Sequence, residues 1–101
     1  MPKFGFTIPH SLTKDEARSR LDRLVEALDK HYAGKVNDLQ QSWDGDTLNF
    51  SAKAFGIQLS GGVTVTDNEL KLDGDLPFAA MMFKGKIESD FREQLERIVA
   101  A

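Results

Sequence analysis

The sequence predicts an α+β fold in which a curved antiparallel sheet, built as a meander, carries two amphipathic helices on one face, in the order β-α-β-β-β-β-α. Three observations support this prediction. Hydrophobic residues recur with a helical period near both ends of the chain, they alternate in between, and turn sequences divide that middle part into strands. A sheet with one wet face needs a cover on the other face, which the helices supply. With 101 residues, 41% of them hydrophobic, residues 1–101 are expected to form a single domain.

The N-terminal part of the chain is predicted to form a short strand followed by one long helix. Hydrophobic residues alternate with Gly and Thr over residues 4–8, which is typical of a strand, and Pro9 ends this run. Thr13 and Glu16 have the spacing of a capping box, in which the threonine hydroxyl accepts a hydrogen bond from the glutamate amide. Hydrophobic residues then recur on one helical stripe, and Gly34 is suited to end the helix because glycine readily adopts a left-handed conformation.

Three turns are predicted to divide the middle of the chain into four antiparallel strands. Asp44-Gly45 suits a two-residue hairpin turn, which would place Trp43 opposite Asp46. At Phe55-Gly56 the hydrophobic positions change from even to odd residue numbers, so a second two-residue turn would keep them on one side of the sheet. The third turn covers residues 66–69. The other side of these strands carries polar and charged residues and is expected to face water.

A second amphipathic helix is predicted near the C-terminus, where one hydrophobic stripe contains Ile87, Phe91, Leu95, Ile98 and Val99. The place of the first strand stays open at this point. It could lie antiparallel to the last strand, which gives the order 1-5-4-3-2, or parallel to the second. An unpaired edge strand could also join two copies of the chain into a homo-oligomer. Gly74 is interpreted as a bulge or a close approach within the sheet.

Composition and charge argue against several functional classes. The chain has no cysteine, which excludes disulfides and thiol nucleophiles. Its net charge is −3, and residues 35–76 hold three lysines against seven acidic residues, so the chain lacks the basic surface that nucleic-acid binding requires. No hydrophobic stretch reaches the roughly 20 residues that span a bilayer, and the N-terminus lacks the hydrophobic region of a signal peptide. We therefore expect a cytoplasmic protein that has no transmembrane segment. We also expect it to bind no nucleic acid.

Catalytic motifs are sparse, and the expected protein is not an enzyme. His10 and His31 have no partner at the spacing of metal ligands, and each is interpreted as a structural residue. The two Asp-Gly-Asp triplets lack the rest of a calcium-binding loop. Gly61-Gly62 lacks the adjoining helix of a phosphate-binding site. No catalytic residue, cofactor or metal site is predicted.

Several short motifs follow one another along the chain: Ile-Pro-His at residues 8–10, Ser-Trp-x-Gly-x-x-Leu-x-Phe at residues 42–50, Gly56, and Leu-Pro-x-Ala with Lys-Gly-x-Ile-Glu between Leu76 and Glu88. In order and spacing they resemble the polyhydroxyalkanoic acid system protein family, small bacterial proteins whose genes lie among those for polyhydroxyalkanoate storage. The resemblance covers nearly the full chain. It implies a non-enzymatic accessory role at or near polymer granules, with the granule surface or granule proteins as partners, and it carries no catalytic residue over to this chain.

A cluster of large hydrophobic residues just before the C-terminal helix has two interpretations. Its members are Phe78, Met81, Met82 and Phe83. They could cover the open end of the core. Alternatively, some of them stay exposed, because consecutive residues cannot all point inward from one helical face, and they form a contact surface for polymer, an acyl chain or a granule protein.

The same architecture allows a second function, that of a carrier for a small hydrophobic ligand such as an acyl chain or a lipid. A meander that grips a long C-terminal helix is analogous in architecture to helix-grip lipid-binding proteins. The pocket would lie between the sheet and the last helix, lined by Phe50, Leu59, Phe91 and Leu95. A pocket there would favour the carrier, whereas a filled core would favour the interaction protein.

Overall fold

The computed structural model describes residues 3–32, 35–54, 56–75 and 78–100. Over these residues it contains the elements β1 (Lys3–Pro9), α1 (Lys14–Leu21), α2 (Leu24–His31), β2 (Val36–Asp44), β3 (Thr47–Ala54), β4 (Ile57–Val65), β5 (Glu69–Asp75), the 3₁₀ helix η1 (Phe78–Phe83) and α3 (Lys84–Ile98). The predicted α+β class and strand succession are confirmed.

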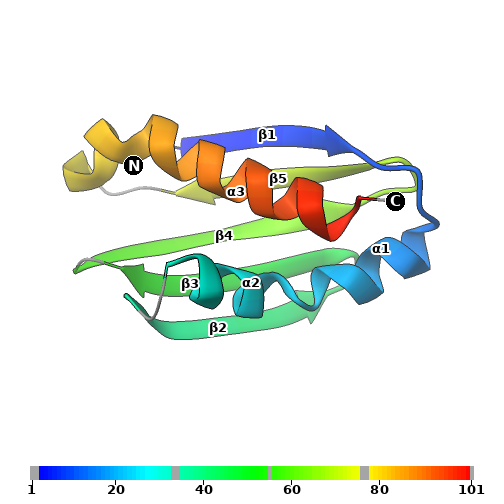
Figure 1. Ribbon diagram of the computed structural model, residues 1–101, viewed down its shortest axis with the longest axis horizontal. Coiled ribbons are helices and arrows are strands. Elements are labelled where there is room, and N and C mark those ends of the chain that lie inside the picture. Colours follow the sequence, from blue (N-terminus) through cyan, green and yellow to red (C-terminus); the bar gives the residue numbers. More distant parts are fainter. Residues whose placement is uncertain (1–2, 33–34, 55, 76–77, 101) are drawn as a thin grey trace.

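The strands form an antiparallel sheet in the order β1-β5-β4-β3-β2, with the helices on one face (Figure 1). β1 pairs antiparallel with β5, from Lys3 opposite Asp75 to Pro9 opposite Glu69, which decides the question that the sequence left open. β1 and β2 are therefore the edges of the sheet. The opposite face carries exposed polar residues such as Lys71, as expected for a solvated face.

The strand registers confirm the second and third predicted turns and correct the first. Ala54 pairs with Ile57, and the third turn brings Val65 opposite Leu70. In the first hairpin Asp44 pairs with Thr47, so the turn is Gly45-Asp46, and Trp43 faces Leu48. The predicted turn at Asp44-Gly45, with Trp43 opposite Asp46, is wrong. Gly45, with φ of +62°, takes the first turn position. The strand pairing extends to Asp44 and Thr47, so Trp43 pairs with the hydrophobic Leu48 instead of with the carboxylate of Asp46.

The single helix predicted from Thr13 to Gly34 is also wrong, because the chain forms two helices with a break after Leu21. The predicted cap is present, since Thr13 Oγ1 accepts a hydrogen bond from the Glu16 amide at 3.1 Å. Helix α1 ends where the Arg23 amide donates to the Arg20 carbonyl oxygen. Gly34 lies outside the described residues.

Contacts with the edge strand β2 are made at this break. The Trp43 indole N–H donates to the Asp22 carboxylate at 2.7 Å, and the Gln41 side chain donates to the Asp22 carbonyl oxygen at 3.2 Å. These bonds hold the junction between α1 and α2 against β2.

The core lies between the helices and the sheet, and Phe91 of α3 occupies its middle. The Phe91 ring stacks on Phe50 of β3 with 5.4 Å between centroids, and it meets Phe4 of β1 at 5.9 Å. All three rings are buried, as is Leu95 one turn later on α3. One helical side chain thus contacts strands from both halves of the sheet.

Gly74 allows Phe4 to pack against the sheet. It pairs with Phe4 on one side and Gly61 on the other, in an unbroken register. A side-chain carbon at Gly74 would overlap the Phe4 ring. Of the two interpretations offered for Gly74, the close approach is therefore correct and the bulge is wrong.

We expect Gly74→Ala to lower the free energy of unfolding by about 1–3 kcal/mol, because the added methyl group would force Phe4 out of its packed position. Gly85→Ala is the matched control. It lies in α3 with no heavy atom within 4 Å of the added carbon, and we expect it to raise stability by about 0.5 kcal/mol. Urea unfolding followed by circular dichroism measures both. Equal stability of the two variants would contradict this account of Gly74.

Candidate functional site

Helix α3 is preceded by η1, which carries three exposed large hydrophobic side chains. Their relative exposures are 43% for Met81, 82% for Met82 and 48% for Phe83. We call these three residues the apolar tip. The fourth residue of the predicted patch, Phe78, starts η1, and its side chain lies outside the described residues. The tip lies at one end of the long axis of the molecule, where η1 joins α3 (Figure 1).

A pocket of about 250 Å³ lies between β4, the first turns of α3 and the residue that follows α2. Most of its wall is hydrocarbon, and its lining residues are Tyr32, Ile57, Leu59, Phe83, Lys86, Ile87 and Asp90. Phe83, which caps α3, and the three lining residues of α3 recur at the spacing i, i+3, i+4 and i+7, so they share one face of that helix. Phe83 belongs to both the tip and the pocket, and the two features are therefore continuous.

The pocket predicted from the sequence is displaced from this one. Phe50, Phe91 and Leu95 are buried in the core, where the first two stack on each other. Leu59 is the one residue of that predicted set that lines the pocket between β4 and α3. These side chains pack against one another at the predicted place, and the pocket between β4 and α3 lies toward the start of α3.

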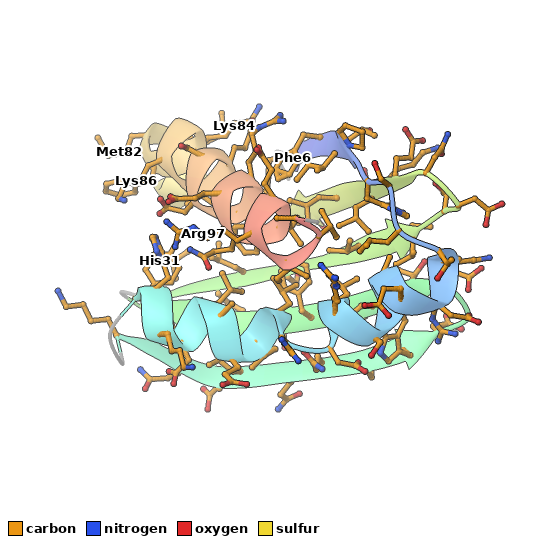
Figure 2. All side chains as sticks on the ribbon, turned by 45° about the vertical axis from the view of Figure 1, so that its right-hand side comes forward. Phe6, His31, Met82, Lys84, Lys86 and Arg97 are labelled. Atoms are coloured by element: carbon orange, nitrogen blue, oxygen red, sulfur yellow. The ribbon has the colours of Figure 1, made fainter. Side chains whose placement is uncertain are left out.

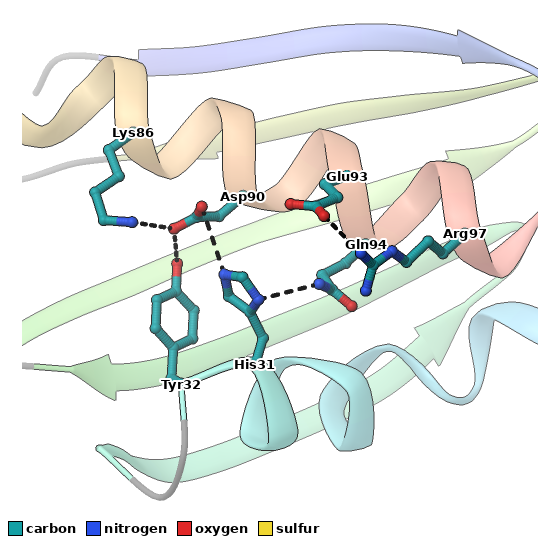
Figure 3. Close-up of polar contacts among 7 residues, drawn as sticks. All are labelled: His31, Tyr32, Lys86, Asp90, Glu93, Gln94 and Arg97. Atoms are coloured by element: carbon teal, nitrogen blue, oxygen red, sulfur yellow. Dashed lines mark hydrogen bonds and ion pairs between the residues drawn. The ribbon is translucent and has the colours of Figure 1, made fainter.

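One end of the pocket is polar because three side chains meet at Asp90 (Figure 3). The Tyr32 hydroxyl donates to Oδ2 of Asp90 at 3.0 Å, and Lys86 Nζ donates to the same oxygen at 3.2 Å. His31 Nε2 lies 3.4 Å from Oδ1. Asp90 is only 8% exposed, so these partners compensate a carboxylate that is largely removed from water.

His31 connects this group to the next turn of α3. Gln94 Nε2 lies 3.2 Å from His31 Nδ1. A neutral imidazole with its proton on Nε2 satisfies both contacts, accepting from Gln94 and facing Asp90 with its N–H. The His31 ring also meets the Tyr32 ring edge-on, at 4.9 Å between centroids. Together these side chains join the end of α2 to α3.

The surroundings shift the pKa values of Tyr32 and Asp90 in opposite directions. Burial of the Tyr32 hydroxyl, helped by its hydrogen bond to Asp90 and by the charge of Asp90, raises the pKa of Tyr32 well above its ordinary 10.0. Burial alone would raise the pKa of Asp90, but the hydrogen bonds from Tyr32 and Lys86 and the nearby positive charge outweigh it, so its pKa falls below 3.8. The Tyr32–Asp90 pair therefore makes its full contribution to stability between pH 3.8 and pH 10.0, the ordinary pKa values of the two groups. Its contribution decreases as pH falls through the lowered pKa of Asp90 or rises above 10.0.

The other histidine has a structural position. His10 Nε2 lies 2.9 Å from the carbonyl oxygen of Thr66, and His10 Nδ1 accepts from the Leu12 amide at 3.1 Å. His10 therefore links the end of β1 to the turn between β4 and β5. In the described ranges, no three His, Cys, Asp or Glu side chains are grouped in a way that could hold a metal ion.

The sequence patterns did not predict the contributions of Tyr32, Lys86 and Asp90. Tyr32 and Asp90 are 58 residues apart, so no local motif connects them. The sequence nevertheless contained one signal of this polar group. Asp90 follows Ile87 by three residues and so lies next to the hydrophobic stripe of α3, where a carboxylate needs partners. The Lys86–Asp90 spacing of i, i+4 was a second signal.

Comparison with known proteins gives one family match. The model of the family described as "Putative polyhydroxyalkanoic acid system protein" matches residues 5–99. A search of curated proteins gave no match. Among solved structures, a crystal structure of Ara h 8.0201 has a TM-score of 0.49 and 8% sequence identity over 99% of both chains, a similarity too distant to inform function. In the part of the chain that the structure describes, no helix has the length and hydrophobicity needed to cross a bilayer.

We expect Asp90→Ala to lower the free energy of unfolding by about 1–3 kcal/mol, because it removes the acceptor of the partly buried Tyr32 hydroxyl. Urea unfolding at neutral pH measures the change. Glu96→Ala, at an exposed position of the same helix, is the control and should change little. An Asp90→Ala protein as stable as the control would show that the network contributes nothing.

Tyr32 is the only tyrosine of the chain, so its ionisation can be followed by ultraviolet absorbance. In the folded protein the midpoint should lie above 10.0, and in urea it should return to the ordinary value. Asp90→Asn should lower the folded midpoint, because the negative charge that opposes a tyrosinate is gone. Circular dichroism of the same samples verifies that they remain folded. Coincident midpoints for folded and unfolded wild type would refute the assigned environment.

Proposed function

Because the chain belongs to the polyhydroxyalkanoic acid system protein family, we propose that it is a non-enzymatic accessory protein of polyhydroxyalkanoate storage that binds at the granule. The apolar tip is the observation that supports this proposal. The proposed role implies a cytoplasmic protein that associates with granules when polymer is present. The partner is the polymer surface itself or a protein bound to it.

The tip has the properties of a contact surface. Three adjacent hydrophobic side chains expose 43–82% of their surface, and two of them are methionines, which adapt to irregular hydrophobic partners. Burying such a side chain on a partner contributes roughly 1.5–3 kcal/mol when burial is complete. The tip can therefore provide a substantial part of a binding free energy.

Two lysines beside the tip match the chemistry of a polyester. Figure 2 shows Met82, Lys84 and Lys86 at the same end of the molecule. A polyhydroxyalkanoate presents alkyl groups, which the tip can contact, and ester carbonyl oxygens, which accept hydrogen bonds from ammonium groups. The non-enzymatic part of the proposal is supported by Asp90, whose oxygens are engaged in joining α2 to α3.

A second candidate function, a carrier for a small acyl or lipid ligand, is favoured by the pocket between β4 and α3. Its hydrocarbon wall could enclose one short chain. The two functions are compatible, since the tip and the pocket share Phe83.

We expect the double variant Met82→Asp with Phe83→Asp to bind washed polymer particles at least about tenfold more weakly than wild type, because two hydrophobic contacts become charged. Co-sedimentation with the particles measures the affinity. The control, Ser19→Asp with Ser89→Asp, adds the same charge at exposed helical positions and should bind as wild type does.

Urea unfolding of the same variants separates binding from folding. If the tip variant unfolds like wild type and still binds particles, the tip does not make the contact. In cells, a fluorescent fusion of wild type should ring the granules only when polymer has accumulated, whereas the tip variant should remain diffuse. Diffuse wild-type fluorescence in the presence of polymer would refute the granule-associated role.

A further inference from the structure

The pocket beside α3 has room for one short aliphatic chain. Its volume of about 250 Å³ corresponds to about eight groups of the size of a water molecule, at roughly 30 Å³ each. Ile57 and Leu59 of β4 form one wall, and Ile87 forms the opposite one. Phe83 is half exposed, so the pocket is accessible from the side on which the tip lies.

The polar end of the pocket offers both a donor and an acceptor. Lys86 has three N–H donors, and its contact with Asp90 uses one. The Tyr32 hydroxyl donates a hydrogen bond to Asp90, which leaves the lone pairs of the Tyr32 oxygen as acceptors for another group. Asp90 thus fixes the direction of the Tyr32 hydroxyl.

A ligand that fits both the hydrocarbon wall and the polar end of the pocket carries a carbonyl and a hydroxyl group near one another, followed by a short alkyl tail. We propose that the pocket binds a single hydroxyacyl unit, with its alkyl tail between Ile57, Leu59 and Ile87, its hydroxyl donating to Tyr32 and its carbonyl oxygen accepting from Lys86. The choice of a hydroxyacyl unit over other chains rests on the proposed function. The unit is present both in soluble hydroxy acids and at the hydroxyl end of the polymer.

The test compares 3-hydroxyoctanoate with octanoate, which has the same chain without the hydroxyl group. Each is titrated into the full-length protein, and the isoleucine and leucine methyl signals are followed by NMR. Saturable shifts at Ile57, Leu59 and Ile87 are expected for 3-hydroxyoctanoate. Octanoate should bind about three- to tenfold more weakly, because it lacks one hydrogen bond to the protein.

Two variants test the assigned partners. Tyr32→Phe should bind octanoate and 3-hydroxyoctanoate equally, because it lacks the hydroxyl acceptor. Lys86→Met should weaken both compounds, whereas Lys84→Met, on the same helix but outside the pocket lining, should weaken neither. Wild type that shows no methyl shifts, or that binds both compounds equally, would overturn the inference. So would an unchanged preference in folded Tyr32→Phe.

The methyl ester of 3-hydroxyoctanoate distinguishes the two sources of the unit. Binding of the ester supports a polymer end as ligand, and binding of the acid alone supports a soluble hydroxy acid. Met82→Asp, which changes the tip but not the pocket lining, separates this inference from the proposed function. It should lose affinity for polymer particles and keep 3-hydroxyoctanoate binding. Failure of particle binding in wild type would therefore refute the granule role without refuting the pocket.

Discussion

The packing of α3 across the sheet is the contact on which the rest of the structure depends. An antiparallel sheet with one dry face must cover that face, and Phe91 does so by touching Phe4 and Phe50. These two residues belong to strands that are separated in the sheet by β5 and β4. The glycine at position 74 leaves the space that the Phe4 ring occupies. A single aromatic ring therefore ties both halves of the sheet to one helix.

The position of α3 also determines where the functional surfaces arise. The middle and end of the helix are buried through Phe91 and Leu95, whereas its first turns and η1 reach the end of the molecule (Figure 1). There the core no longer covers the hydrophobic side chains, which leaves the tip exposed and the pocket beside it unfilled. The network at Asp90 limits the pocket by holding the end of α2 against α3.

Local patterns were sufficient to predict much of the fold. The change from even to odd hydrophobic positions near Gly56 predicted the pairing of β3 with β4, and Thr13 predicted the start of α1. Features that depend on contacts distant in the sequence could not be predicted. At the break after Leu21, Asp22 meets Trp43 of β2, a contact between residues distant in the sequence. The polar end of the pocket likewise depends on residues from α3 and the end of α2. The stacking of Phe50 on Phe91, at the place where the sequence suggested a pocket, is also a contact between residues distant in the sequence.

Because the tip lies at one end of an elongated molecule, it determines how the protein would stand on a crowded surface. The protein measures 37 × 25 × 23 Å, and η1 lies at the end of the longest dimension. A molecule held by the tip stands upright and occupies the area of its two shorter dimensions, with its sheet edges pointing sideways toward its neighbours. Upright molecules can form a denser layer than molecules lying flat. Lateral spacing in such a layer would be governed by the sides of the protein, which take no part in holding it to the surface.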